Sequence, residues 1–145
     1  GLDAYKDWFL SVLSDFTALR ERTKVILPYG TGTTALGVLA AIFEEKLNMQ
    51  VVGISVSRDR YQCLSSAKEL VNEEMLKFLH INDRYSGRYG EREAYHNDLR
   101  MEFLNRFGIL PDPIYNVRVL EHLHEEDVTE GIVIHTGGQL NNLVS

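Results

Sequence analysis

A turn rich in glycine and threonine, Gly-Thr-Gly-Thr-Thr at residues 30–34, carries groups well suited to binding an anion. Gly30 and Gly32 can adopt positive φ angles and let the backbone come close to a ligand. Successive backbone N–H groups in such a turn form a nest, and the start of a helix adds partial positive charge. Three hydroxyl groups are further donors, those of Thr31, Thr33 and Thr34. The turn indicates a phosphate site, the alternative being a plain strand–helix turn.

Two common nucleotide-binding motifs do not fit this turn. No Walker A lysine follows it, and residue 35 is alanine where the dinucleotide fingerprint has glycine. A second glycine turn, Ile-His-Thr-Gly-Gly at 134–138, ends another apolar run. Ligands of open parallel sheets bind at the carboxyl ends of strands. We therefore expect both turns at one edge of a sheet, around one small-molecule site.

The elements that position these turns follow from hydrophobic spacing. Apolar residues recur at helical spacing in 2–22, and short apolar runs at 24–28 and 50–57 are typical of buried strands. The remaining expected elements are helices at 33–47, 58–79, 93–108, 117–127 and from 139, a loop at 81–92, an extended segment at 109–116 and a strand at 131–135. Strands alternating with helices predict one α/β domain over residues 1–145. We expect an open, mostly parallel sheet of three or four strands, with helices on both faces.

Composition narrows the classes of partner. The 145 residues have a net charge of −6, which disfavours nucleic acid and anionic membranes as partners. No apolar stretch is long enough for a transmembrane helix, and no signal pattern opens the sequence. Cys63 is the single cysteine, so no intrachain disulfide can form, and its simplest role is a buried thiol. These features predict a cytoplasmic protein.

Other chemistries fit less well. His122 and His124 lie two residues apart among acidic residues, which is typical of a solvated helix face, and no Cys/His spacing fits zinc. No Gly-x-Ser-x-Gly elbow indicates a serine hydrolase. Tyrosine and arginine alternate at Arg84, Tyr85, Arg88 and Tyr89. They could stack on nucleic acid, but the acidic net charge argues against it.

Taken together, five segments resemble a known family. They are Gly-Thr-Gly-Thr-Thr-Ala-Leu-Gly-Val (30–38), Val-Val-Gly-Ile-Ser-Val-Ser-Arg (51–58), Tyr-Ser-Gly-Arg-Tyr-Gly-Glu (85–91), Pro-Asp-Pro-Ile-Tyr-Asn (111–116) and Ile-His-Thr-Gly-Gly (134–138). In this order they are similar to the C-terminal part of the 1-aminocyclopropane-1-carboxylate deaminase and D-cysteine desulfhydrase family. Members are pyridoxal-phosphate enzymes with the tryptophan-synthase-β-like fold. The resemblance covers about residues 24–140.

The resemblance implies pyridoxal 5′-phosphate as cofactor, a small amino acid as substrate, and a role for each matching residue. The cofactor phosphate would be held by Gly30, Thr31, Gly32, Thr33 and Thr34. The two active-site tyrosines would be Tyr89 and Tyr115. Asn116 would lie opposite the pyridine nitrogen. The edge of the cofactor would be lined by His135, Thr136, Gly137 and Gly138.

Three departures from the family bear on activity. Thr33 replaces a loop glycine, which would cause strain if the position needs a positive φ. Asn116 replaces a glutamate of the deaminases or a threonine of the desulfhydrases, and Arg118 replaces part of the segment that follows. A neutral amide supports a protonated pyridine nitrogen less well than a carboxylate does. The asparagine at 116 therefore favours D-cysteine desulfhydrase-like β-elimination over ring-opening deamination.

The Schiff-base lysine of the family has no counterpart here. None of the five lysines stands in the family's Asn-Lys context. We therefore expect the chain alone to be inactive and to represent the C-terminal part of a longer enzyme. The alternative is a non-catalytic α/β module that binds a phosphorylated ligand or a partner chain. A small sheet leaves an unpaired edge, so we expect association with the missing N-terminal half or with another copy, as a homo-oligomer.

Overall fold

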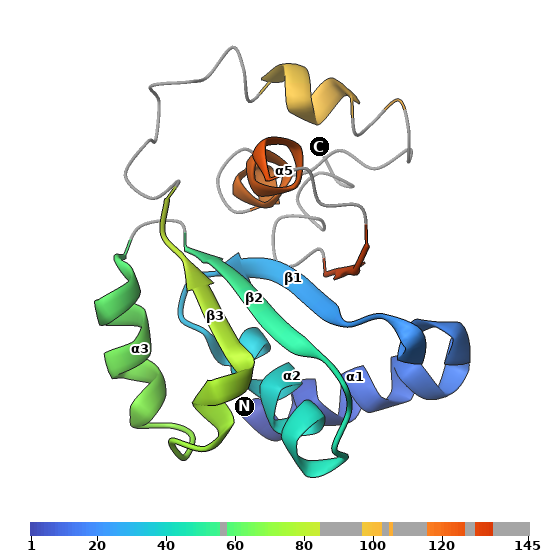
Figure 1. Cartoon of the computed structure of the whole chain (residues 1–145), viewed down its shortest axis with the longest axis vertical. Coiled ribbons are helices and arrows are strands. Elements are labelled where there is room, and N and C mark those ends of the chain that lie inside the picture. Colours follow the sequence, from blue (N-terminus) through green and yellow to red (C-terminus); the bar gives the residue numbers. More distant parts are fainter. Residues whose placement is uncertain (56–57, 85–96, 103–104, 106–115, 127–129, 135–145) are drawn as a thin grey trace.

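The computed structural model describes residues 1–145 except 56–57, 85–96, 103–104, 106–115, 127–129 and 135–145. In chain order its elements are α1 (Leu2–Asp15), the 3-10 helix η1 (Thr17–Glu21), β1 (Lys24–Tyr29), α2 (Thr33–Glu44), β2 (Gln50–Ser55), α3 (Arg60–Lys68), the 3-10 helix η2 (Met75–Phe78), β3 (Leu79–Asn82), α5 (Asn116–Glu125) and β4 (Ile132–Val133). Residues 97–102 are also helical and lie above α5 in Figure 1.

In the part of the chain that the structure describes, four parallel strands form the sheet, in the order β3-β2-β1-β4. Val25 of β1 lies opposite Val51 of β2 on one side and Ile132 of β4 on the other. The chain therefore moves outward from β1 to β3 and then returns to the opposite side of β1. Parallel neighbours need a crossover connection, which α2 and α3 provide for the first three strands. The expected open parallel α/β sheet is confirmed.

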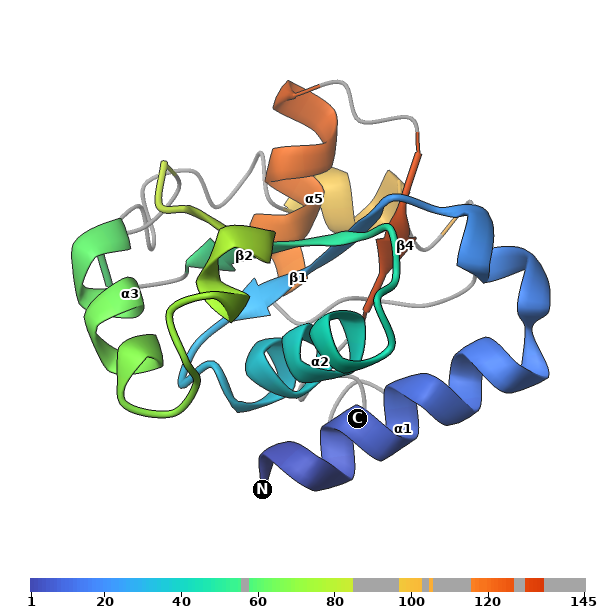
Figure 2. The ribbon, with the colours of Figure 1, turned by 60° about the horizontal axis from the view of Figure 1, so that its bottom comes forward.

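Alternate residues of the strands pack on opposite faces of the sheet. On one face, Leu27 and Val51 join a large apolar cluster with residues of α1, α2 and α3. On the other face, Ile26 and Ile54 pack against Val119 of α5 in a smaller cluster. Figure 2 shows this order of layers, with α5 on one side of the sheet and α2, then α1, on the other. The prediction of helices on both faces is confirmed.

The contact between α1 and α2 depends on a residue without a side chain. A Cβ at Gly37 of α2 would lie 2.5 Å from the Cβ of Tyr5 and 2.8 Å from the backbone oxygen of Leu2. Nearby, Lys6 Nζ donates to the Glu44 carboxylate at 3.0 Å and ties the two helices together. The helices therefore pack close enough to bury α2 between the sheet and α1.

The N-terminal helix is shorter than the predicted 2–22. α1 stops at Asp15, Phe16 leaves the helical conformation with φ −125° and ψ 74°, and η1 follows. Ser14, Asp15 and Thr17 surround this break. Their short polar side chains compete for backbone hydrogen bonds and lower helix propensity. Apolar spacing alone could not show the break, because it continues into η1.

The predicted helix at 58–79 is wrong in its second half. α3 ends at Lys68, and Oδ1 of Asn72 accepts a hydrogen bond from the backbone N–H of Met75 at 3.1 Å. This local bond starts the separate helix η2. Asparagine favours such turns over a continuous helix, which explains the interruption.

The sheet gains a strand at residues that the sequence analysis assigned to the end of that helix and to a loop at 81–92. β3 pairs with β2, with Leu79 opposite Val51. Leu79 and Ile81 are buried while His80 between them is exposed. This alternation is the normal pattern of a strand with one covered face. The run is only four residues long, which is why helical spacing dominated the prediction.

Other predicted elements agree closely with the structure where it describes them. The helix at 33–47 corresponds to α2, the strand at 50–57 to β2 and the helix at 117–127 to α5, each with slightly different ends, whereas only Ile132–Val133 of the predicted strand at 131–135 form β4 in the described residues. The helix at 93–108 is described in part, and residues 97–102 are helical. The segments at 109–115 and from 139 lie outside the described residues. No helix in the described ranges is both long and apolar enough to span a membrane.

A carboxylate clamp joins the starts of β1 and β4. Both oxygens of Glu130, which precedes β4, accept hydrogen bonds from Thr23, which precedes β1. One bond comes from the backbone N–H and one from the hydroxyl, each at 2.9 Å. These two bonds lower the pKa of Glu130 because they favour its ionised form.

We predict that Glu130→Gln destabilises the chain at pH 7 and weakens its acid sensitivity. The lowered folded pKa means that the stabilisation is complete above the unfolded value of about 4.3 and is lost as the pH falls through the folded value. Thermal unfolding from pH 7 to pH 3 measures both effects. Glu21→Gln, at an exposed position at the end of η1, is the matched control. Equal losses of stability on acidification in wild type and Glu130→Gln would contradict the clamp.

Candidate functional site

The glycine turn lies where the sequence analysis placed it, between the carboxyl end of β1 and the amino end of α2. Gly32 is the N-cap of α2, with left-handed φ 92° and ψ −4°. Its backbone oxygen accepts the first helical hydrogen bond, from Leu36 N–H at 2.8 Å. No side chain caps this helix end in the described structure. The first backbone N–H groups of α2 are therefore available to an anion.

The threonines of the turn surround this helix end. The Oγ1 atoms of Thr31 and Thr33 lie 3.3 Å apart, within hydrogen-bonding distance. Thr31 is exposed, while Thr33 and Thr34 are half-buried. Among the described residues, Lys46 is the one non-glycine residue with a positive φ. Thr33 therefore sits in the first turn of α2 without the strain that its replacement of glycine could have caused.

Tyr29 lies directly under the turn. Its side chain is 1% exposed, and its hydroxyl would be 2.5 Å from a Cβ at Gly32. This hydroxyl has no hydrogen-bond partner among the described residues. Burial raises the pKa of Tyr29 to about 12, so the group stays a neutral phenol. The tyrosine ring thus forms the floor of the turn and restricts residue 32 to glycine.

The turn opens beside the point where the strand order reverses, between β1 and β4. Ile134 N–H donates to Ile26 O at 2.9 Å, so the backbone groups of Ile26 face β4. The backbone groups of Pro28, two residues later in the strand, face the same side, but proline has no N–H to donate. The missing donor favours separation of the two strands at their carboxyl ends. Ligands of open α/β sheets bind in the crevice at such a reversal.

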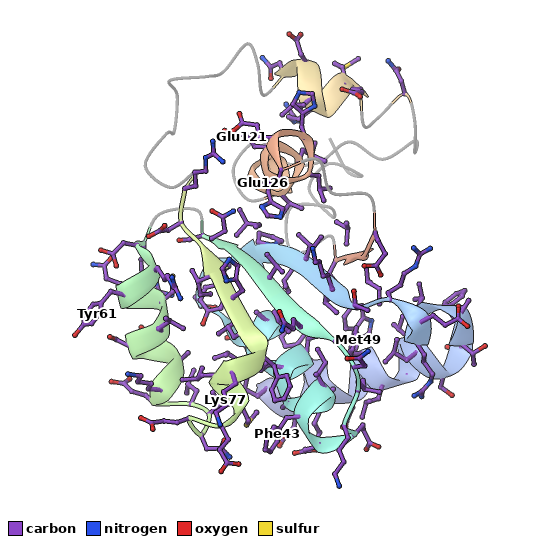
Figure 3. The ribbon with its side chains drawn as sticks, viewed as in Figure 1. Phe43, Met49, Tyr61, Lys77, Glu121 and Glu126 are labelled. Atoms are coloured by element: carbon purple, nitrogen blue, oxygen red, sulfur yellow. The ribbon has the colours of Figure 1, made fainter. Side chains whose placement is uncertain are left out.

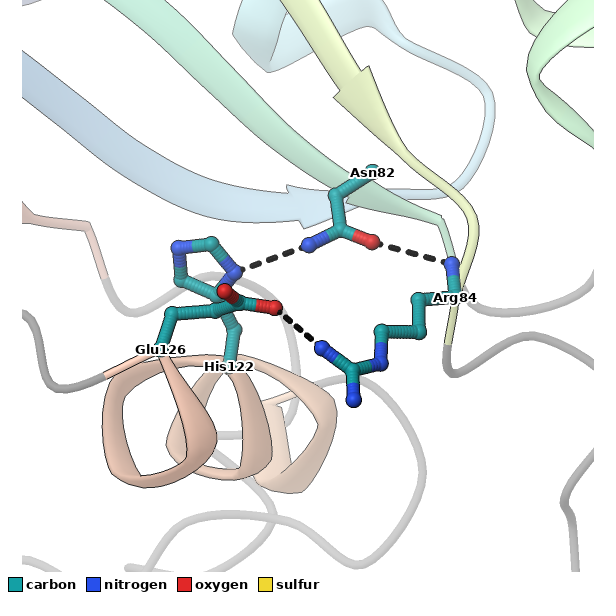
Figure 4. A network of polar contacts seen from close by, with 4 residues as sticks. All are labelled: Asn82, Arg84, His122 and Glu126. Atoms are coloured by element: carbon teal, nitrogen blue, oxygen red, sulfur yellow. Dashed lines mark hydrogen bonds and ion pairs between the residues drawn. The ribbon is translucent and has the colours of Figure 1, made fainter.

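A polar network at the same end of the sheet holds α5 (Figure 4). Arg84 N–H donates to Oδ1 of Asn82 at 2.9 Å, so the amide nitrogen of Asn82 faces His122. That nitrogen lies 2.9 Å from Nδ1 of His122, which must therefore accept and carry no proton. The Arg84 guanidinium also pairs with Glu126 at 2.7 Å. These contacts connect the end of β3 to α5.

The environment of His122 differs from the predicted solvated helix face. Its side chain is 8% exposed, and burial lowers its pKa, because the charged form would lose water contacts. Opposing this, Glu126 raises the pKa, while Lys24 and His80 lower it further. His124 is exposed, as expected. No group of three or more metal-binding side chains occurs in the described ranges.

The structure describes only part of the predicted site. The phosphate turn is described in full, and Asn116 begins α5. The side chain of Asn116 and the segments that carry the other predicted residues lie outside the description, so their roles stay predictions. Those residues are Tyr89, Tyr115, His135, Thr136, Gly137 and Gly138. Tyr29 and Arg58 both contact the turn and were not among the predicted site residues, although Arg58 ends one of the quoted motifs.

Comparisons with known proteins show the fold. The sequence matches no protein-family profile and no curated protein. A crystal structure of an ACC (1-aminocyclopropane-1-carboxylate) deaminase homologue is similar, with a TM-score of 0.74 and 21% identity over 95% of this chain and 46% of that chain. A mutant O-ureido-L-serine synthase with bound O-ureido-L-serine is similar with a TM-score of 0.52 and 15% identity, over 91% of this chain and 43% of that chain.

The chain thus has the fold of the corresponding part of these proteins and spans less than half of their length. At such identities the likeness establishes the fold. The first structure is a homologue of the deaminase that the sequence motifs resemble. The fold therefore agrees with the fold that the sequence resemblance implies.

We predict that Tyr29→Phe stabilises the chain by about 1 kcal/mol, because it removes a buried hydroxyl that lacks a hydrogen bond. Urea unfolding measures the change as a higher midpoint at unchanged slope. Tyr61→Phe is the matched control, since Tyr61 extends from α3 into solvent and is 79% exposed (Figure 3). A fall in stability for Tyr29→Phe would show that the hydroxyl has a partner and would contradict this interpretation.

We predict that His122 destabilises the fold as the pH drops below about 6.5, the ordinary pKa of histidine. Its folded pKa is lowered, so the unfolded chain takes up the proton first and stability is lost on acidification. An NMR titration of the imidazole measures the folded pKa, and thermal unfolding measures the loss. Asn82→Asp should raise that pKa, because a carboxylate favours the imidazolium. An unchanged pKa in Asn82→Asp would contradict the network.

Proposed function

We propose that this chain binds the phosphate of pyridoxal 5′-phosphate and forms the cofactor-binding part of an enzyme related to ACC deaminase and D-cysteine desulfhydrase. One observation carries the proposal. The N-terminus of α2, which begins after the left-handed Gly32 and has no side-chain cap, opens at the carboxyl end of the interior strand β1, beside the reversal of strand order. Phosphate groups bind at such helix ends. The resemblance of the sequence motifs indicates that this phosphate is the one of pyridoxal 5′-phosphate.

The described residues fit the phosphate end of this cofactor. A Cβ at Gly32 would fill the space above Tyr29, so the turn stays open only with glycine there. The uncapped N–H groups of α2 can donate to phosphate oxygens. The hydroxyls of Thr31, Thr33 and Thr34 stand around the same helix end. When bound, pyridoxal phosphate supplies an electron sink for reactions of amino acids.

The roles of the remaining residues are part of the proposal. On the sequence resemblance, we assign Tyr89 and Tyr115 to the active site, one to act on substrate groups and the other to pack near the cofactor ring, and Asn116 to the pyridine nitrogen. A neutral amide at 116 holds the proton of that nitrogen less firmly than a carboxylate. We therefore favour β-elimination from D-cysteine over opening of the ACC ring. The Schiff-base lysine would come from sequence outside this chain, since the similar structures are more than twice as long.

The substrate preference can be tested on the assembled enzyme, with the lysine-bearing part present. We expect release of sulfide from D-cysteine to exceed release of ammonia from ACC. Asn116→Glu should shift the balance toward ACC, because a carboxylate keeps the pyridine nitrogen protonated. If the assembled enzyme converts ACC but does not convert D-cysteine, the proposed preference for D-cysteine is contradicted. The proposed phosphate site would not be affected by that result.

The binding proposal can be tested on the chain itself by calorimetry. We expect inorganic phosphate and pyridoxal 5′-phosphate to bind with similar dissociation constants, on the order of 1 mM, or about −4 kcal/mol. Pyridoxal, which lacks the phosphate, should not bind. Gly32→Ala should abolish binding, because its Cβ would meet the Tyr29 ring. Thr17→Ala in η1 is the control at an exposed threonine.

Two outcomes would count against the proposal. Absence of saturable phosphate binding by the wild-type chain would remove its basis. Binding of inorganic phosphate together with rejection of pyridoxal 5′-phosphate would favour a module for another phosphorylated ligand.

A further inference from the structure

Arg58 connects the phosphate turn to the neighbouring helix. Its Nη2 donates to the backbone oxygen of Gly30 at 2.6 Å, and its Nη1 donates to Oγ of Ser66 in α3 at 2.9 Å. One planar guanidinium therefore joins two segments that follow different strands. The fixed fork of arginine suits such a double contact, which the single ammonium of lysine cannot reproduce.

The backbone of Arg58 is itself anchored by buried groups. The Ser55 hydroxyl at the end of β2 donates to the backbone oxygen of Arg58. Cys63 Sγ lies 3.7 Å from that hydroxyl and 4.0 Å from the same backbone oxygen. Ser55 and Cys63 are fully buried. Arg58 is thus held at both ends, by the sheet through its backbone and by α3 through its side chain.

The bond to Gly30 determines where the next backbone N–H points. In a planar trans peptide the C=O of one residue and the N–H of the next are antiparallel. No cis peptide bond occurs among the described residues. With the Gly30 oxygen held toward Arg58, the Thr31 N–H points away from Arg58. Glycine at 30 permits other orientations of this peptide, so an external contact is needed to select one.

We propose that Arg58 is a positioning residue for the phosphate site. It holds the Gly30–Thr31 peptide in the one orientation that adds the Thr31 N–H to the donors at the start of α2. The inference rests on the proposed phosphate binding and adds the residue that preorganises it. Preorganised donors bind an anion more tightly because the turn loses less conformational freedom on binding.

Two simpler roles for Arg58 make different predictions. If Arg58 acted only through its positive charge, Arg58→Lys would retain phosphate affinity. If it only fastened α3 to the protein, its loss would lower stability and leave phosphate affinity unchanged. Positioning requires that both Arg58→Lys and Arg58→Gln weaken binding and that Ser66→Ala, which removes only the far anchor, has a smaller effect in the same direction.

The experiment is an NMR titration of the full ¹⁵N-labelled chain with inorganic phosphate at constant ionic strength. We expect Arg58→Gln and Arg58→Lys to weaken phosphate binding at least about tenfold, as loss of one hydrogen bond to a charged group would. Ser66→Ala should weaken it about twofold. Before phosphate is added, the Thr31 amide signal should move in both Arg58 variants and stay in place in the exposed control Thr17→Ala.

The outcomes separate this inference from the proposed function. If wild type and Arg58→Lys bind phosphate equally, the positioning role is overturned and the phosphate site stands. If the wild-type chain binds no phosphate, both proposals fall. Should Arg58→Gln not fold, as seen from loss of signal dispersion, Arg58→Lys and Ser66→Ala decide the matter by the same criteria.

Discussion

The site depends on one backbone conformation, the left-handed one of Gly32. It lets the chain turn from β1 into α2 within three residues, so the helix starts at the carboxyl edge of the sheet with its N–H groups facing outward. The Tyr29 ring beneath leaves no room for a side chain at that point. A second glycine, Gly37, then lets α1 pack closely on the same helix. Two positions without side chains therefore set the place and direction of α2.

The two faces of the sheet are stabilised differently. The face covered by α1, α2 and α3 is held by a large continuous apolar cluster. On the α5 face the apolar cluster is small, and polar contacts add to it, between Asn82 and His122 and between Arg84 and Glu126. Close packing makes the first face a rigid support, and the phosphate turn belongs to it.

Much of the framework could be predicted from sequence, because strong local patterns produce it. The apolar runs of β1 and β2 and the glycine turn between β1 and α2 are such patterns. β3 was missed because its four residues carry too short an alternation, and Asn72 was not recognised as a helix stop. The prediction that His122 is solvated was wrong, because its acidic neighbours in sequence do not reveal its contact with Asn82 of β3. Arg58 and Tyr29 act through contacts with distant residues, which one sequence cannot show.

The number of residues between two groups that contact each other has a consequence for folding. Arg58 and Gly30, which shape the turn, are 28 residues apart, whereas Thr23 and Glu130 are separated by 107. Closing a longer loop costs more chain entropy, and contacts distant in sequence slow folding. The β1–α2–β2 unit can therefore assemble before β4 joins the sheet. In this order the phosphate turn and its contact with Arg58 would form while the chain is still being synthesised, and the contact between Thr23 and Glu130 only after β4 has docked.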